Sequence, residues 1–394
     1  MVLSGSIEVR NGETILKANL LQVSDGTIKY STEQRVDNAL RLPETIVAAV
    51  LVNAVISVNA AERARINKPD TESAEARSLY LLGQYYSRTN KDGNQVDKAV
   101  EAFTKAKDLD QNYAKAWAGL AVAYLFQSAP GAKAAVPPQQ SAVLARRAAQ
   151  KAVDLDPTLA DAYYALAQIC IRYEWNWAEA ERNDRIALSL NPDFLPARSG
   201  LINVLRLQGR YDEALTETNR IREIDPLTNS ADLQEAMIYY KKRDIQRSFD
   251  IVSTARQSAP DNVRIKYMMA YRLIALGRPA EAVEIIEPLY NTSKEEERVT
   301  NATPLGIAYA EMGRADKAQS IIADLEYLGT RNYVPAQERA LIYTALGDRD
   351  RAFELLQRSC DERFSTFPDL MNDPVIDPIR DDPRYADLRR CANL

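Results

Sequence analysis

Few side chains in this chain of 394 residues are suited to catalysis. Histidine is absent, which removes the commonest general base, the commonest metal ligand and every Ser-His or Cys-His nucleophile. The cysteines Cys170, Cys360 and Cys391 lie far apart, are odd in number and form no C-x-x-C spacing. We therefore expect free thiols, with Cys170 in the core, and we expect no enzyme, no metal and no cofactor.

Side chains suited to recognition, in contrast, recur along the chain. Arginine and lysine can bind carboxylates, whereas tyrosine and methionine supply apolar contact area. Amides and arginines dominate the first half of the series, and tyrosine and methionine dominate the second. The predicted partner-binding residues are Tyr80, Gln84, Arg88, Tyr164, Gln168, Arg172, Asn203, Arg206, Met237, Tyr240, Lys241, Tyr267 and Tyr271.

Proline marks the period of the elements that must position these residues. Phrases such as Leu155-Asp156-Pro157 recur, and their prolines, Pro157, Pro192, Pro226 and Pro260, follow one another at intervals of 35, 34 and 34 residues. Proline stops one helix and suits the first turn of the next. The pattern predicts a unit of two helices.

Glycine marks the turn within each of the later units, at Gly209, Gly277, Gly313 and Gly347. Each is followed by an acidic or alanine-rich stretch that favours a second helix. Glycine ends a helix in the left-handed conformation at little cost. We therefore expect pairs of helices joined at these glycines.

A period of 34 residues resembles that of the tetratricopeptide repeat (TPR), which has two antiparallel helices per unit. The resemblance implies a mainly α fold, a right-handed TPR α-solenoid of about eight helix pairs over residues 73–363. Residues 127–140 are expected to be an insertion, and residues 291–299 a charged link. The first helix of each pair lines the concave side, so the partner-binding residues would face a groove.

The first 57 residues do not follow this period. Strands are predicted from Val2 to Arg10, from Glu13 to Val23 and from Thr27 to Thr32, with a turn at Asn11-Gly12 and a helix from Pro43 to Ile56. This small α/β segment, residues 1–57, is followed by a linker, residues 58–72. A free edge of its sheet would permit a homodimer.

The stretch from Val2 to Ser31, V-L-S-G-S-I-E-V-R-N-G-E-T-I-L-K-A-N-L-L-Q-V-S-D-G-T-I-K-Y-S, resembles the later part of a TolB-like amino-terminal module. The phrase Trp175-Asn176-Trp177 and the ending around Asp377-Pro378 are similar to the same group of proteins. The resemblance implies the docking or sensory half of a bacterial signalling system. Such TPR proteins include CadC-type regulators and proteins linked to adenylate cyclases or Ser/Thr kinases, with the effector upstream.

Residues 364–394 are dense in Asp-Pro, at Asp373-Pro374, Asp377-Pro378 and Asp382-Pro383. Such a segment is not expected to extend a helix. It is expected to cover the exposed face of the last repeat as a capping tail, and the alternative is a binding motif.

The charge of −5 has both signs interspersed, which argues against nucleic acid as a partner. The most apolar stretch, Ile46 to Ile56, is too short to span a membrane. Free thiols favour the cytoplasm, with the periplasm as the alternative.

These observations predict a non-catalytic scaffold that binds a protein or peptide segment in the groove, with an acidic segment as a candidate partner. The alternative is a small-ligand-sensing domain controlling a linked effector, with a pocket at Tyr164, Gln168 and Arg172. A further alternative is that the tyrosines and arginines merely cover neighbouring helices.

Overall fold

The computed structural model describes residues 2–10, 13–21, 28–35, 70–89, 95–127, 138–331 and 333–394. Two compact units divide the chain. The first comprises Met1–Leu82 with Lys105–Tyr113, and the second comprises Gly83–Thr104 with Ala114–Leu394.

The first unit contains a three-stranded antiparallel sheet of β1 (Val2–Arg10), β2 (Glu13–Leu21) and β3 (Ile28–Arg35), in that order. The register of β1 on β2 runs from the pair Val2 and Leu21 to the pair Arg10 and Glu13. The predicted turn at residues 11–12, the predicted helix at 43–56 and most of the linker at 58–72 lie outside the described residues.

Helix pairs make up the second unit, and in each pair the two consecutive helices pack on each other. The helices α3 (Ala74–Arg88) and α4 (Val96–Leu109) precede these pairs and are divided between the two units. The pairs are α5 (Ala114–Gln127) with α6 (Pro138–Leu155), α7 (Ala160–Ile169) with α8 (Trp177–Leu190), α9 (Leu195–Leu207) with α10 (Tyr211–Ile224), α11 (Ser230–Lys241) with α12 (Ile245–Ser258), α13 (Val263–Ala275) with α14 (Pro279–Thr292), α15 (Glu295–Glu311) with α16 (Ala315–Gly329), and α17 (Ala336–Leu346) with α18 (Arg349–Asp361). A short π-helical turn, η2 (Cys170–Glu174), extends α7.

The first helices of the pairs form a row that is continuous from α5 to α11 and again from α13 to α17. Contacts join α5 to α7, α7 to α9, α9 to α11, α13 to α15 and α15 to α17. We call the surface that this row presents the inner surface. The predicted mainly helical, TPR-like arrangement is confirmed.

Glycine closes the first helix where the sequence predicts it. Gly209, Gly277, Gly313 and Gly347 adopt positive φ values of 75°, 71°, 71° and 80°. No side chain lies within 4 Å of where a Cβ would stand on any of them, so backbone conformation, not crowding, explains the residue type.

Small residues let neighbouring helices approach closely. A Cβ on Gly83 of α3 would stand 2.7 Å from the ring of Phe103 in α4, and a Cβ on Gly119 of α5 would stand 2.6 Å from the same ring. Ala145 and Ala149 of α6 are fully buried. The core is therefore filled by large side chains set against small ones, as helix packing requires.

The predicted charged link at 291–299 is wrong. Helix α14 continues to Thr292 and α15 already begins at Glu295, so the connection is only Ser293 and Lys294. Glu295 and Glu297 lie in the first turn of α15, where negative charge favours the helix terminus.

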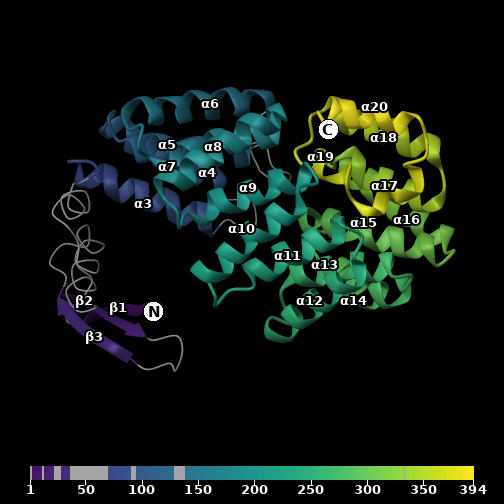
Figure 1. The fold of residues 1–394 in the computed structure, drawn as a ribbon, viewed down its shortest axis with the longest axis horizontal. Coiled ribbons are helices and arrows are strands. Elements are labelled where there is room, and N and C mark those ends of the chain that lie inside the picture. The colour runs from purple at the N-terminus through teal and green to yellow at the C-terminus, as the bar shows by residue number, and fades with distance from the viewer. Residues whose placement is uncertain are drawn as a thin grey trace. The chain divides into compact units, whose positions relative to one another are not determined.

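The C-terminal segment, residues 364–394, folds into three short helices after α18. It forms α19 (Phe367–Leu370), the 3-10 helix η3 (Pro374–Ile379) and α20 (Arg384–Cys391). Pro368 and Pro374 lie in the first turns of α19 and η3, where a proline sacrifices no helical hydrogen bond, and Pro378 lies inside η3. Helix η3 packs on α17 and α13. Helix α20 packs on α18 (Figure 1).

The cysteines correct a second expectation. Cys360 at the end of α18 and Cys391 in α20 form a disulfide, with their Cα atoms 6.4 Å apart. Residues 31 apart in sequence cannot be recognised as a pair without knowing that α20 returns to α18. Cys170 is free and buried, as predicted, and burial raises the pKa of its thiol to about 12.

Candidate binding surface

Two predicted cations of the inner surface meet the C-terminal segment. The ammonium of Lys241, at the end of α11, lies 2.9 Å from an Asp369 carboxylate oxygen and 2.8 Å from an Asp373 carboxylate oxygen. It also donates to the Asp369 backbone carbonyl at 2.7 Å. Arg206 of α9 lies 2.9 Å from the other Asp369 carboxylate oxygen. We call these four residues the tail cluster.

Burial makes the charge pairing of the tail cluster strong. The Lys241 side chain is 0% exposed, and its ammonium makes two hydrogen bonds and a further ion pair with the segment. Burial alone would raise the pKa of Asp369, but Arg206 and Lys241 outweigh it and hold that pKa well below its usual range. Asn203, another predicted site residue, accepts a hydrogen bond from Arg206 at 2.7 Å.

Further contacts extend along the segment on both sides of this cluster. Arg243 pairs with Asp377 at 2.6 Å, and the Asn372 amide donates to the Leu207 carbonyl at 2.8 Å. At the far end, the Trp177 indole N–H donates to the Asn393 carbonyl at 2.9 Å. The segment is thus held by α8, α9 and α11 as well as by its disulfide.

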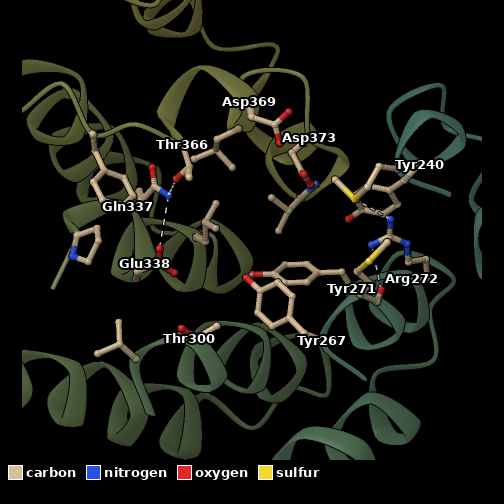
Figure 2. Close-up of a pocket in the computed structure, with 18 of the residues that line it drawn as sticks. Tyr240, Tyr267, Tyr271, Arg272, Thr300, Gln337, Glu338, Thr366, Asp369 and Asp373 are labelled. Carbon is tan, nitrogen blue, oxygen red and sulfur yellow. Dashed lines mark hydrogen bonds between the residues drawn. The ribbon is translucent and has the colours of Figure 1, made fainter. Parts of the chain in front are cut away.

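An inner cavity of about 380 Å³ lies between the inner surface and the C-terminal segment (Figure 2). Its walls come from α11, α13, α15 and α17 on one side and from the segment on the other. The lining residues are Met237, Tyr240, Tyr267, Met268, Tyr271, Arg272, Val299, Thr300, Tyr333, Pro335, Gln337, Glu338, Leu341, Phe364, Thr366, Asp369, Leu370, Asp373 and Val375.

Two predicted tyrosines of α13 project into the middle of this cavity. The Tyr267 and Tyr271 hydroxyls are 3.3 Å apart, and their rings meet edge to face with centroids 4.9 Å apart. Burial raises the pKa of both hydroxyls, so both stay protonated. Figure 2 shows their hydroxyls directed toward the side on which Glu338 and Gln337 lie.

Glu338 and Gln337, from the start of α17, form the polar side of the cavity. Glu338 accepts a hydrogen bond from the Thr303 hydroxyl at 2.6 Å, and burial raises the pKa of its carboxyl. The Gln337 amide donates to the Thr366 hydroxyl at 2.9 Å. Its carbonyl oxygen is buried and has no hydrogen-bond partner within the described residues.

Arg272 of α13 forms the opposite side of the cavity. It is 2% exposed, and its guanidinium lies 4.3 Å from the centroid of the Tyr240 ring. It donates to the Ser248 hydroxyl and to the Met268 carbonyl, each at 3.0 Å. No carboxylate of the described chain lies within 4.0 Å of the Arg272 guanidinium. Burial lowers the pKa of Arg272 to about 10. Met237, a predicted site residue, contacts its third nitrogen through sulfur at 3.1 Å.

The predicted residues of α7 and η2 have other surroundings. Arg172 lies over the Phe126 ring at 4.9 Å, and Tyr164 meets the Phe194 ring edge-on at 5.6 Å. Gln168 is half-buried. The small-ligand pocket expected at Tyr164, Gln168 and Arg172 stays a prediction.

The three predicted residues of α3 fall in both compact units. Tyr80 is buried in the first unit, where its ring lies 5.3 Å from that of Tyr113. In the second unit, Gln84 is half-buried and Arg88 is exposed.

Sequence reasoning missed Asp369, Asp373, Arg272, Gln337 and Glu338. A signal for the first two was present, because a cationic inner surface and an Asp-rich segment occur in one chain. The other three carry no motif, and only the folded arrangement of α13 and α17 brings them together.

Two general features of the described residues bear on function. No helix among them is long and apolar enough to cross a membrane. No cluster of three or more potential metal-ligating side chains occurs among them either.

Comparisons with known proteins agree with the helix-pair architecture. A tetratricopeptide repeat family model matches residues 195–218 and 263–288. A tetratricopeptide repeat protein from Parabacteroides merdae is 14% identical, with a TM-score of 0.50 over 70% of this chain and 98% of its own. Yeast Tom70 is 18% identical, with a TM-score of 0.51 over 80% of this chain and 68% of its own. No curated protein matches the sequence. Residues 195–218 and 263–288 therefore match the tetratricopeptide repeat, and the helix pairs have the fold of TPR proteins.

Proposed function

We propose that this chain is a non-catalytic scaffold that binds a protein or peptide segment along its inner surface. The TPR fold supports an interaction role, because stacked helix pairs expose an extended row of side chains instead of a closed active site. The proposed ligand for the α9–α11 region is an acidic segment that carries two aspartates.

The observation that carries this proposal is the tail cluster. Arg206 and Lys241 hold the carboxylates of Asp369 and Asp373 through contacts of 2.8 to 2.9 Å. Buried cations of this kind need anions, since an unpaired buried charge is strongly unfavourable. In this chain the anions come from its own C-terminal segment. A partner segment of similar chemistry would either replace that segment or extend along the inner surface beyond it.

The biological setting of the scaffold is part of the proposal. The TolB-like resemblance of the first residues suggests the docking or sensory half of a bacterial signalling system. The disulfide between Cys360 and Cys391 supports the periplasmic alternative, because such bonds persist in oxidising compartments. We also propose a homodimer through a free edge of the β1–β3 sheet, because an unpaired strand edge can pair with another chain.

Small-ligand sensing is the second candidate function. The inner cavity favours it, because a volume of about 380 Å³ falls within the range of small-molecule sites. The cavity shares Asp369 and Asp373 with the C-terminal segment, so an occupant could stabilise that segment's position.

A peptide added in trans tests the scaffold proposal. A fluorescent peptide with the sequence of residues 366–379 is titrated into the full chain and into the full-length double variant Asp369→Asn/Asp373→Asn, and anisotropy is measured. The variant's own segment no longer neutralises Arg206 and Lys241, so we expect it to bind the peptide about tenfold more tightly than the unaltered chain does.

Two controls make the result specific. A peptide with both aspartates replaced by asparagine should not bind the double variant. The full-length variant Asp381→Asn, which alters an exposed pair with Arg349, should behave like the unaltered chain. Equal binding of both peptides, or of neither, would contradict an acid-binding inner surface.

A further inference from the structure

One side of the inner cavity gathers hydrogen-bond acceptors that lack a cationic partner. The Glu338 carboxylate lines the cavity, yet no lysine or arginine of the described residues lies within 4.0 Å of it. The Gln337 carbonyl oxygen beside it is buried and has no donor among the residues that the structure describes, and the Gln337 side chain is 6% exposed. A buried acceptor left without a donor is costly, so the site is built to receive one.

The tyrosines complete this polar side. The Tyr267 and Tyr271 hydroxyls can each accept a further hydrogen bond through an oxygen lone pair. Their rings, together with Tyr333 and Phe364, place aromatic surface around the same space. Aromatic faces attract ammonium groups through their quadrupole. Carboxylate, amide oxygen, hydroxyl and ring therefore all favour a cationic donor.

We propose that the inner cavity binds a primary ammonium group carried on a short apolar chain, with Glu338 as its counter-ion. Gln337 and the two tyrosines accept its remaining hydrogen bonds. Met237, Leu341 and Phe364 contact its carbon chain.

The cations around the cavity do not favour an anionic ligand. Three nitrogens of Arg272 already contact Ser248, Met268 and Met237, and its face lies on Tyr240. The ammonium of Lys241 has three acceptors in the C-terminal segment. Glu338 and Arg272 are the two charged groups of the cavity lining without an opposite charge within 4.0 Å on the described chain, and they lie on opposite sides of the cavity (Figure 2). Of the two, Glu338 lies beside the Gln337 carbonyl oxygen, which has no donor among the described residues.

Isothermal titration calorimetry on the full chain tests the site with n-butylammonium. Neutral n-butanol and anionic butyrate are matched ligands of nearly the same size. We expect butylammonium to bind in the millimolar range or tighter, and the other two to bind at least about tenfold more weakly. Tighter binding of butyrate, or no binding of butylammonium, would overturn the proposal.

Variants assign the counter-ion. Glu338→Gln keeps the shape of the side chain and should weaken butylammonium binding at least about tenfold. Tyr271→Phe keeps the ring and should weaken it a few-fold. Glu354→Gln, which alters an exposed pair with Arg351, should leave it unchanged. Unchanged affinity in both cavity variants would also overturn the proposal.

Proton release gives a readout that a change in folding does not produce. Because burial raises the pKa of Glu338, binding of a cation should expel protons from the carboxyl at mildly acidic pH. The measured binding enthalpy should then vary with the ionisation enthalpy of the buffer in the unaltered chain and not in Glu338→Gln.

The ammonium can come from a free amine or from a lysine side chain of a bound segment. Comparing butylammonium with the capped peptide Ac-Ala-Ala-Lys-Ala-Ala-amide distinguishes these sources. Binding of the free amine alone identifies a small-amine site, and tighter binding of the peptide identifies a lysine-reading site within the scaffold. Both arms use Glu338 and not the tail cluster, so this test can fail while the proposed acid-binding function stands.

Discussion

Two regions of the inner surface carry similar cationic side chains, but these side chains have different partners. In α7 and η2, Arg172 lies on the Phe126 ring and has no carboxylate of the described residues within 4.0 Å. In α9 and α11, Arg206 and Lys241 are buried and paired with aspartates of the C-terminal segment. Position in the repeat alone therefore does not determine which groups a cation of the inner surface contacts. The contacts of such a cation depend on whether the C-terminal segment packs against it.

Replacing Lys241 should have the largest effect on this comparison. Lys241→Ala leaves the Asp369 and Asp373 carboxylates partly buried with only Arg206 as a cation, so we expect a loss of about 3–5 kcal/mol in the free energy of unfolding. Urea unfolding followed by circular dichroism measures it. The control, Lys241→Ala combined with Asp369→Asn and Asp373→Asn, should recover part of the loss, and a purely additive triple variant would contradict a charge-pair origin.

Loss of the disulfide should have the second-largest effect on stability. Closing a loop of about 30 residues between Cys360 and Cys391 stabilises the folded chain by about 3–4 kcal/mol in the chain-entropy model. Cys391→Ser should therefore speed proteolysis within residues 364–394 and leave α7 to α10 resistant. Limited proteolysis with mass spectrometry checks this, and Cys170→Ser is the control. Equal resistance of the C-terminal segment in both variants would contradict its dependence on the bond.

Two buried aspartates should make the stability of the chain depend on pH in opposite directions. Asp369 is paired and its pKa is lowered, so its contribution to stability is present above about pH 4 and is lost on acidification. Asp184 of α8 has two buried carboxyl oxygens without partners in the described chain, and burial raises its pKa. Its folded form favours the proton, so the chain loses stability as the pH rises above about 4.

The variants Asp184→Asn and Asp369→Asn separate these signs. Asp184→Asn should stabilise the chain at pH 7 by about 1–3 kcal/mol and have little effect near pH 3.5, because the neutral amide removes a buried charge. Asp369→Asn should destabilise it at pH 7 and lose that effect on acidification. Thermal unfolding from about pH 1.5 to 7.5 gives both profiles, because the effect of Asp369 is lost only as the pH falls well below 4. Parallel profiles would contradict the assignment.

The sequence predicts local features of this molecule well. The helix pairs follow from proline and glycine spacing, because both residues act within one turn of their own position. Gly277 and Gly347 show this directly, with left-handed φ values at predicted helix ends. Cys170 was assigned to the core from its place in the helical period.

Contacts between distant residues could not be predicted in the same way. Lys241 pairs with residues about 130 positions further along the chain, and Arg206 with one 163 positions away. The Asp-Pro phrases indicated an acidic segment, but nothing local indicates that it turns back onto α9 and α11. For the same reason the sequence did not predict the pairing of Cys360 with Cys391 or the meeting of Glu338 with Tyr271.

Arg172 should give the smallest effect. Its guanidinium contacts the Phe126 ring at a partly exposed position, so Arg172→Ala should change the unfolding free energy by about 0.5–1 kcal/mol. Urea unfolding beside Lys241→Ala makes the comparison direct. A loss as large as that of Lys241→Ala would mean that the two regions do not differ as described.

Amide hydrogen exchange of residues 367–394 in the full chain tests most directly whether the inner surface holds an acidic segment through charge. We expect protection of α19, η3 and α20 in the unaltered chain, and selective loss of protection around α19 and η3 in Asp369→Asn/Asp373→Asn while α13 to α17 stay protected. Rapid exchange of the segment in the unaltered chain, or unchanged protection in the double variant, would contradict the account.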